Sequence, residues 1–279
     1  MSYTAEISRR NPSCFLFLID QSGSMVDPFG GEESGRRKAD QVADVINRLL
    51  QNLIIKCAKQ EGVRDYYHIG VIGYGTQVGP AFAGALAGRE LVPIGEVANN
   101  PARIEAREKK VDDGAGGLAD QTVRFPIWFD PVATGGTPMC QALTRAQSIM
   151  QGWTSQHAHG FPPLVINISD GEPTDGDPGV PAQSVTQLST GDGNVLLFNI
   201  HISSQSGAPI IFPDSQETLP DDHARLLFSM SSQLPEFLRT FVQQEGINVS
   251  ENTRGFAFQA DLVTLIKFLD IGTRPSNLR

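Results

Sequence analysis

The sequence is poor in cysteine and in long apolar runs. Its 279 residues include three cysteines, Cys14, Cys57 and Cys140, whose spacing suits neither a disulfide framework nor a zinc site. We therefore expect reduced thiols and a cytoplasmic protein. The apolar run at 14–19 is too short for a signal peptide or a spanning helix, so no membrane association is expected.

Basic residues are also scarce. Lysine and arginine number 22 against 31 acidic residues, which gives a formal net charge of −9. A nucleic-acid surface needs clustered lysine and arginine to neutralise phosphates. The short basic runs at 36–38 and 109–110 are interpreted as solvated helix faces or helix ends. The composition argues against nucleic acid as a partner and suits the recruitment of cations.

The rest of the composition is that of an ordinary folded protein. Hydrophobic residues make up 40% of the chain and charged residues 19%, so it is neither disordered nor fibrous. No stretch with the composition of a linker divides it. We interpret residues 1–279 as a single domain, with an insertion at about 83–131 and an elaborated region at about 204–254.

Strand and helix patterns alternate along the chain. Continuous apolar runs predict buried strands, and shorter apolar segments predict short strands. The predicted strands are at 14–19, 67–74, 77–82, 90–94, 164–169, 195–202 and 256–258. Helical spacing or composition predicts helices at 36–60, 101–110, 138–153, 226–243 (broken near Pro235) and 261–269. The alternation predicts an α/β fold: a doubly wound, mostly parallel central sheet flanked by helices, with 256–258 as an edge strand.

Two of the predicted central strands end in aspartate. Asp20 follows the first strand, and Asp170 follows a later one. In open α/β sheets, ligands bind in the crevice beyond the carboxyl ends of the strands, so both acids should lie in one crevice. Asp20 also begins an Asp-x-Ser-x-Ser pattern, in which a tight turn at Gly23 lets the hydroxyls of Ser22 and Ser24 face the carboxylate.

A third oxygen-bearing segment lies between the two acids in the sequence. Thr137 follows two glycines and precedes a predicted helix, where we expect it at the N-cap position. Two carboxylates and three hydroxyls form a hard, all-oxygen set, which suits Mg²⁺ or Mn²⁺ and does not suit zinc or copper. The sequence thus predicts one metal site formed by five residues: Asp20, Ser22, Ser24, Thr137 and Asp170.

The three motifs together resemble the metal-ion-dependent adhesion site of von Willebrand factor type A (vWA) domains. Asp20, Ser22 and Ser24 match the first motif of that family, Thr137 the second, and Asp170 the third. The resemblance covers about Phe15 to Ile202. It implies that the hydroxyls are direct or near-direct ligands and that the two aspartates bind the ion directly or through water. It also implies a protein partner whose Glu or Asp completes the coordination shell.

Within that family, the chain is most similar to stand-alone bacterial proteins. Members of this kind are associated with tellurium-resistance and stress systems and with protein kinases or phosphatases. The resemblance therefore implies a metal-dependent adaptor without catalytic activity of its own.

Other interpretations remain open. Ser22 and Ser24 alone would also suit a turn or a helix cap. A Mg²⁺-dependent phosphohydrolase with Asp20 as nucleophile would want a second acid two residues later, where the chain has Ser22, and neither a Gly-x-Ser-x-Gly motif nor a P-loop occurs. An accessory subunit of a metal chelatase or ATPase would use the same metal site. The other acids near the motifs are assigned to the rim, without a ligand role: Asp27, Asp175 and Asp177.

Overall fold

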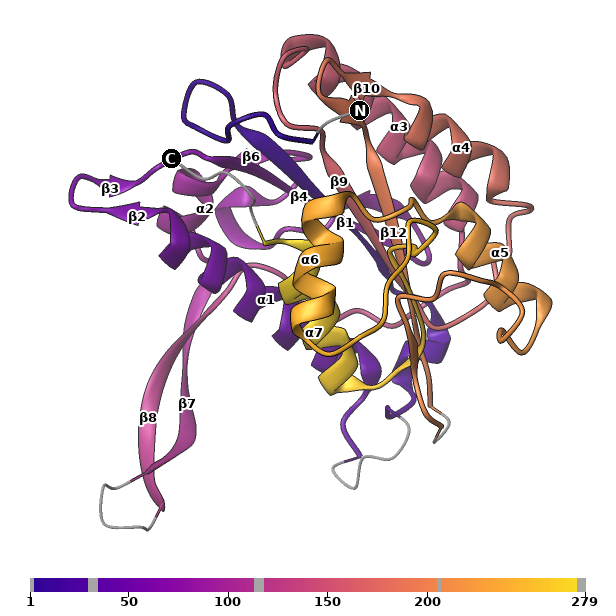
Figure 1. Cartoon of the computed structure of the whole chain (residues 1–279). Helices are drawn as coiled ribbons and strands as arrows, with labels where there is room; N and C mark the ends of the chain where they lie inside the picture. Colours follow the sequence, from indigo (N-terminus) through magenta and orange to yellow (C-terminus); the bar gives the residue numbers. More distant parts are fainter. Residues whose placement is uncertain (1–2, 30–34, 113–117, 205–206, 275–279) are drawn as a thin grey trace.

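The computed structural model describes residues 3–29, 35–112, 118–204 and 207–274 (Figure 1). Within these residues, eight strands form one sheet in the order β13-β14-β12-β9-β1-β4-β5, with β6 also paired to β4. The central strands β14, β12, β9, β1 and β4 are parallel, and the marginal strands pair antiparallel. The predicted mostly parallel sheet is confirmed. Its strands are β1 (Ser13–Asp20), β4 (Tyr67–Tyr74), β5 (Val78–Pro80), β6 (Val92–Pro93), β9 (Leu164–Ser169), β12 (Leu196–Ile202), β13 (Ile210–Ile211) and β14 (Phe256–Ala260).

Helices cover both faces of this sheet (Figure 1). Successive residues of a strand point to opposite faces, so Phe15 and Phe17 of β1 enter one core, and Leu16 and Leu18 enter the other. The first core is closed by α1, α6 and α7, and the second by α3, α4 and α5. The flanked α/β arrangement is therefore confirmed. The helices are α1 (Lys38–Cys57), α2 (Ile94–Asn99), α3 (Met139–Gln156), α4 (Gly179–Gln187), α5 (Asp222–Met230), α6 (Glu236–Gln244) and α7 (Leu262–Gly272).

Most predicted elements lie within a few residues of their expected bounds. The helix expected at 226–243 is divided into α5 and α6, on either side of a segment that includes Pro235. The strand expected at the edge, 256–258, is not at the edge, because β13 pairs with the outer side of β14. The strand β13 and the helices α5 and α6 all lie within the elaborated region predicted at about 204–254.

The helix expected at 101–110 is wrong. This segment lies in β7 (Arg103–Asp112), which pairs antiparallel with β8 (Leu118–Ile127). Glutamate, lysine and arginine favour a helix on their own, but pairing along the whole length of β8 outweighs that preference. Midway along the hairpin, the Arg107 guanidinium lies 3.9 Å from the centroid of the Phe125 ring and 2.8 Å from a carboxylate oxygen of Asp44. The hairpin lies within the predicted insertion and extends away from the body of the molecule (Figure 1).

No helix among the described residues is both long and apolar enough to cross a membrane.

Short elements complete the described chain. The short elements are the 3₁₀ helices η1 (Gly23–Val26) and η2 (Gly84–Leu86) and the strand pairs β2 (Ala58–Lys59) with β3 (Gly62–Val63) and β10 (Ser189–Thr190) with β11 (Gly193–Asn194).

The strand order creates a topological switch point at β1. The chain passes from β1 to β4 on one side and later to β9, β12 and β14 on the other. Loops that leave β1 and β9 therefore diverge, and in open sheets this is where ligands bind. Asp20 is the last residue of β1, and Asp170 directly follows β9. The fold thus places both acids at the switch point.

Candidate metal site

Asp20 is buried at the end of β1, and both of its carboxylate oxygens accept hydrogen bonds. Oδ1 accepts from the backbone N–H of Ser22 and Oδ2 from the hydroxyl of Ser169, each at 2.8 Å. Burial raises the pKa of Asp20 to about 6; hydrogen bonds from Ser22 oppose this rise, and the charge of Asp170 adds to it. A cation bound beside Asp20 would favour its ionised form.

The hydroxyls of the first loop form a chain that leads to Asp170. Ser22 Oγ lies 3.0 Å from Ser24 Oγ, and Ser24 Oγ donates to Asp170 Oδ1 at 2.7 Å. Ser22 is buried, whereas Ser24 is exposed. The first and third motifs are therefore in contact, and the contact reaches the surface at Ser24.

The loop that precedes α3 (the second loop) is fixed by backbone hydrogen bonds against the loop that follows β1 (the first loop). The N–H of Thr134 donates to the carbonyl of Gln21 at 2.6 Å, and the N–H of Gly23 donates to the carbonyl of Gly135 at 2.9 Å. Gly135 has φ +88°, and a Cβ there would lie 2.4 Å from the backbone nitrogen of Thr76. Only glycine fits this position without a shift of the backbone.

The loop that follows β9 (the third loop) binds Thr137 through Thr174. The N–H of Thr137 donates to Thr174 Oγ1 at 3.0 Å, and its carbonyl accepts from the N–H of Thr174, also at 3.0 Å. A Cβ built at Gly171 would lie 3.8 Å from Thr137 Oγ1, so this hydroxyl is next to the residue that follows Asp170. The structure therefore brings the three predicted motifs together at the carboxyl ends of the central strands.

The expected N-cap role of Thr137 is wrong. The helix α3 begins at Met139, with Pro138 at the N-cap position. The hydrogen-bond acceptor for the first turn of this helix comes from the third loop. The carboxylate of Asp175 accepts hydrogen bonds from the backbone N–H groups of Cys140 and Gln141, each at 3.0 Å. Asp175, assigned only to the rim from the sequence, thus fixes the helix that follows Thr137.

Lys38 is a residue of the candidate site that the sequence interpretation missed. Its Nζ lies 2.6 Å from Asp170 Oδ2, and the two side chains are 3% and 0% exposed. Expected on a solvated face, it is instead buried, although its neighbours Arg36 and Arg37 are exposed. The signal was present in the sequence, because Lys38 precedes Val42 by one helical turn on the buried stripe of α1.

The donor set fits a hard divalent cation. The oxygens of Ser22, Ser24 and Asp170 follow one another at 3.0 and 2.7 Å, and Asp20 adjoins them through the N–H of Ser22. Two carboxylates balance the charge of Mg²⁺, and all the atoms are oxygens. Among the described residues, no group of three or more His, Cys, Asp or Glu side chains offers another metal site.

A cleft of about 360 Å³ opens beside Asp170 and Lys38. His201, in its wall, stacks on Phe258 with ring centroids 4.6 Å apart. Burial, and next the charge of His223, lowers the pKa of His201 to about 4, so this ring is neutral at neutral pH. The wall also includes three carboxylates near the candidate metal site: Asp27, Glu172 and Asp221.

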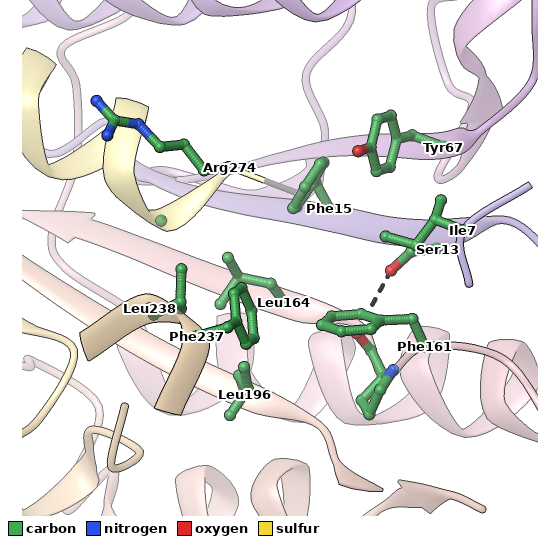
Figure 2. Close-up of a pocket in the computed structure, with 12 residues that line it drawn as sticks. Ile7, Ser13, Phe15, Tyr67, Phe161, Leu164, Leu196, Phe237, Leu238 and Arg274 are labelled. Carbon is green, nitrogen blue, oxygen red and sulfur yellow. Dashed lines mark hydrogen bonds between the residues drawn. The ribbon is translucent and has the colours of Figure 1, made fainter. Parts of the chain in front are cut away.

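A second cavity lies at the other end of the strands from Asp20 and Asp170 (Figure 2). It is lined by residues at or near the amino ends of the strands, among them Phe15, Tyr67, Leu164 and Leu196. Its volume of about 20 Å³ has room for about one water molecule. The cleft beside Asp170 is therefore the better candidate for contact with a ligand.

No protein-family model and no curated protein matches this sequence. Similar solved structures are three N-terminal domains of the type V pili tip protein Mfa5 from Porphyromonas gingivalis (18% identity, TM-score 0.31), the vWF domain of the same protein (19%, 0.30), and the adhesive tip pilin GBS104 from Group B Streptococcus agalactiae (15%, 0.29). Each similarity covers 58% of this chain and 20%, 39% and 47% of those chains, respectively, so the chain spans less than half the length of each. These similarities are too low to identify a family or a function, and the α/β assignment rests on the strand order.

Proposed function

We propose that this chain is a vWA-type protein-interaction module whose bound Mg²⁺ or Mn²⁺ takes up an acidic side chain of a protein partner. Asp20, Ser22, Ser24, Thr137 and Asp170 would hold the ion. The observation that carries the proposal is the convergence of three loops at the switch point of the sheet, with Ser24 Oγ donating to Asp170 Oδ1 at 2.7 Å.

The chemistry of these side chains supports anion binding. Neutral hydroxyls donate less charge to a cation than carboxylates do, so an ion held largely by hydroxyls keeps a strong attraction for an incoming anion. Ser24 is exposed, and the neighbouring cleft is open to solvent. A Glu or Asp side chain on a partner protein has the charge and the oxygen atoms to complete the coordination shell.

The surroundings of Asp20 favour binding over catalysis. A nucleophilic carboxylate must reach its substrate, but Asp20 is 0% exposed, and both of its oxygens accept hydrogen bonds. The acid that a phosphohydrolase would want two residues later is absent, because residue 22 is serine. We therefore propose an adaptor without catalytic activity, and the family resemblance points to a kinase or phosphatase of a bacterial stress system as its partner.

We also propose that the module works in the cytoplasm. Its three cysteines are unpaired thiols, and two of them, Cys14 and Cys57, are buried in the core. Unpaired thiols of this kind suit a reducing compartment.

The proposal is tested by Mg²⁺-dependent capture of a partner from a lysate of the source cells. Immobilised wild-type protein should retain the partner in MgCl₂ and release it in EDTA, and Asp20→Asn and Ser24→Ala should each abolish retention. Ser229→Ala is the matched control, because this exposed serine donates only within α5, to the carbonyl of Leu226. Retention that persists in EDTA, or that survives both site substitutions, would contradict the proposal.

A further inference from the structure

We propose that Lys38 is an internal counter-ion, which a divalent cation displaces from Asp170 into the adjacent acidic cleft when it binds. The inference rests on the proposed metal site and extends it, because it gives a role to a residue outside the five ligands. It predicts that Lys38 weakens ion binding and that its ammonium group changes place when the ion is bound.

The first support is the burial of the ion pair. Lys38 Nζ lies 2.6 Å from Asp170 Oδ2, and neither side chain is more than 3% exposed. A buried charge without a partner is strongly destabilising. In the ion-free protein, Lys38 therefore holds one oxygen of the Asp170 carboxylate in place, while Ser24 donates to the other oxygen.

The second support is charge balance. The carboxylates of Asp20 and Asp170 match the two charges of the ion, so a retained ammonium group would leave one positive charge in excess. Two cations that share one carboxylate repel each other, and burial makes the repulsion stronger than in water. Ion binding and the contact between Lys38 and Asp170 therefore oppose each other.

The third support is the place to which the ammonium group can move. Lys38 lines the cleft of about 360 Å³ whose wall includes Asp27, Glu172 and Asp221. The flexible four-carbon side chain can reorient while the start of α1 stays fixed, because the N–H of Lys38 donates to the carbonyl of Asp27 at 2.8 Å.

A Mn²⁺ titration followed by electron paramagnetic resonance tests the competition. Lys38→Met should bind Mn²⁺ about tenfold more tightly than the wild type or better, because the ion no longer displaces a cation. Lys56→Met is the matched control: it removes the same charge from the same helix, but Lys56 is exposed and pairs with Asp270 at 3.8 Å. Its affinity should equal that of the wild type.

The possible results separate this inference from the proposed function. If the wild type binds Mn²⁺ and Lys38→Met binds it equally or more weakly, the role of Lys38 is wrong and the metal site stands. If neither protein binds Mn²⁺, both proposals are overturned.

Lysine acetylation of the wild-type protein gives a second test, which does not depend on the folding of a variant. In EDTA, Lys38 should resist acetic anhydride because it is buried. Saturation with Mn²⁺ should accelerate its acetylation several-fold, as measured by peptide mass spectrometry, while the rate at Lys56 stays constant. Equal protection of Lys38 with and without Mn²⁺ would overturn the inference.

Discussion

Replacement of Asp170 by alanine should destabilise the ion-free protein, by less than the roughly 3–5 kcal/mol that a buried charge left without a partner costs, because the Lys38 ammonium group loses its partner but can move into the adjacent acidic cleft. That group lies 2.6 Å from Asp170 Oδ2 and its side chain is only 3% exposed, so water cannot take over the lost contact without a rearrangement. The hydroxyl of Ser24 loses its acceptor as well. Urea unfolding in EDTA at neutral pH measures the change in the free energy of unfolding.

A double substitution shows whether the unpaired charge is the cause. Lys38→Met combined with Asp170→Ala should recover part of the lost stability, because no buried charge remains. Asp222→Ala is the control, since this fully exposed carboxylate also pairs with a basic side chain, that of Arg225 at 2.8 Å, and should leave the midpoint almost unchanged. A double variant as unstable as the sum of the two single variants would contradict this explanation.

Gly135→Ala should weaken Mn²⁺ binding by about tenfold or more, with a loss of stability of about 1–3 kcal/mol from strain. The new Cβ would lie 2.4 Å from the backbone nitrogen of Thr76, and the φ of +88° is one that L-residues rarely adopt. The second loop must therefore move, and Thr137 moves with it, away from the first and third motifs. Isothermal titration with MnCl₂ measures the affinity.

Gly79→Ala in β5 is the matched control for that substitution. A Cβ at Gly79 meets nothing within 4 Å, so the variant should bind Mn²⁺ as the wild type does. Wild-type affinity in Gly135→Ala would show that the second loop need not keep its position for the ion to bind.

The parts of the fold that were predictable are those with a local signal. All eight residues of β1 are buried, and the continuous apolar run at 14–19 indicates a central strand without any knowledge of its neighbours. Because parallel strands end at one edge of the sheet, the position of Asp20 and Asp170 after two such runs predicted their proximity. The contact between Ser24 and Asp170 agrees with that reasoning.

The parts that were not predictable depend on contacts between distant segments. The composition of β7 favours a helix, and only its pairing with β8 makes it a strand. The acceptor that caps α3 comes from Asp175, a residue of another loop. The ion pair of Lys38 likewise depends on a carboxylate far along the chain. Its burial could have been predicted from its place one turn before Val42, but a basic residue at the start of a helix gave the wrong impression of a solvated face.

The most direct test of the metal site is a crystal structure of the protein grown with MnCl₂, with an anomalous difference map recorded at the manganese edge. The map should contain one strong peak at the carboxyl ends of β1 and β9, in coordination contact with the hydroxyls of Ser22 and Ser24. A map without a peak there at saturating MnCl₂, or with its strong peak elsewhere on the molecule, would contradict the proposed function.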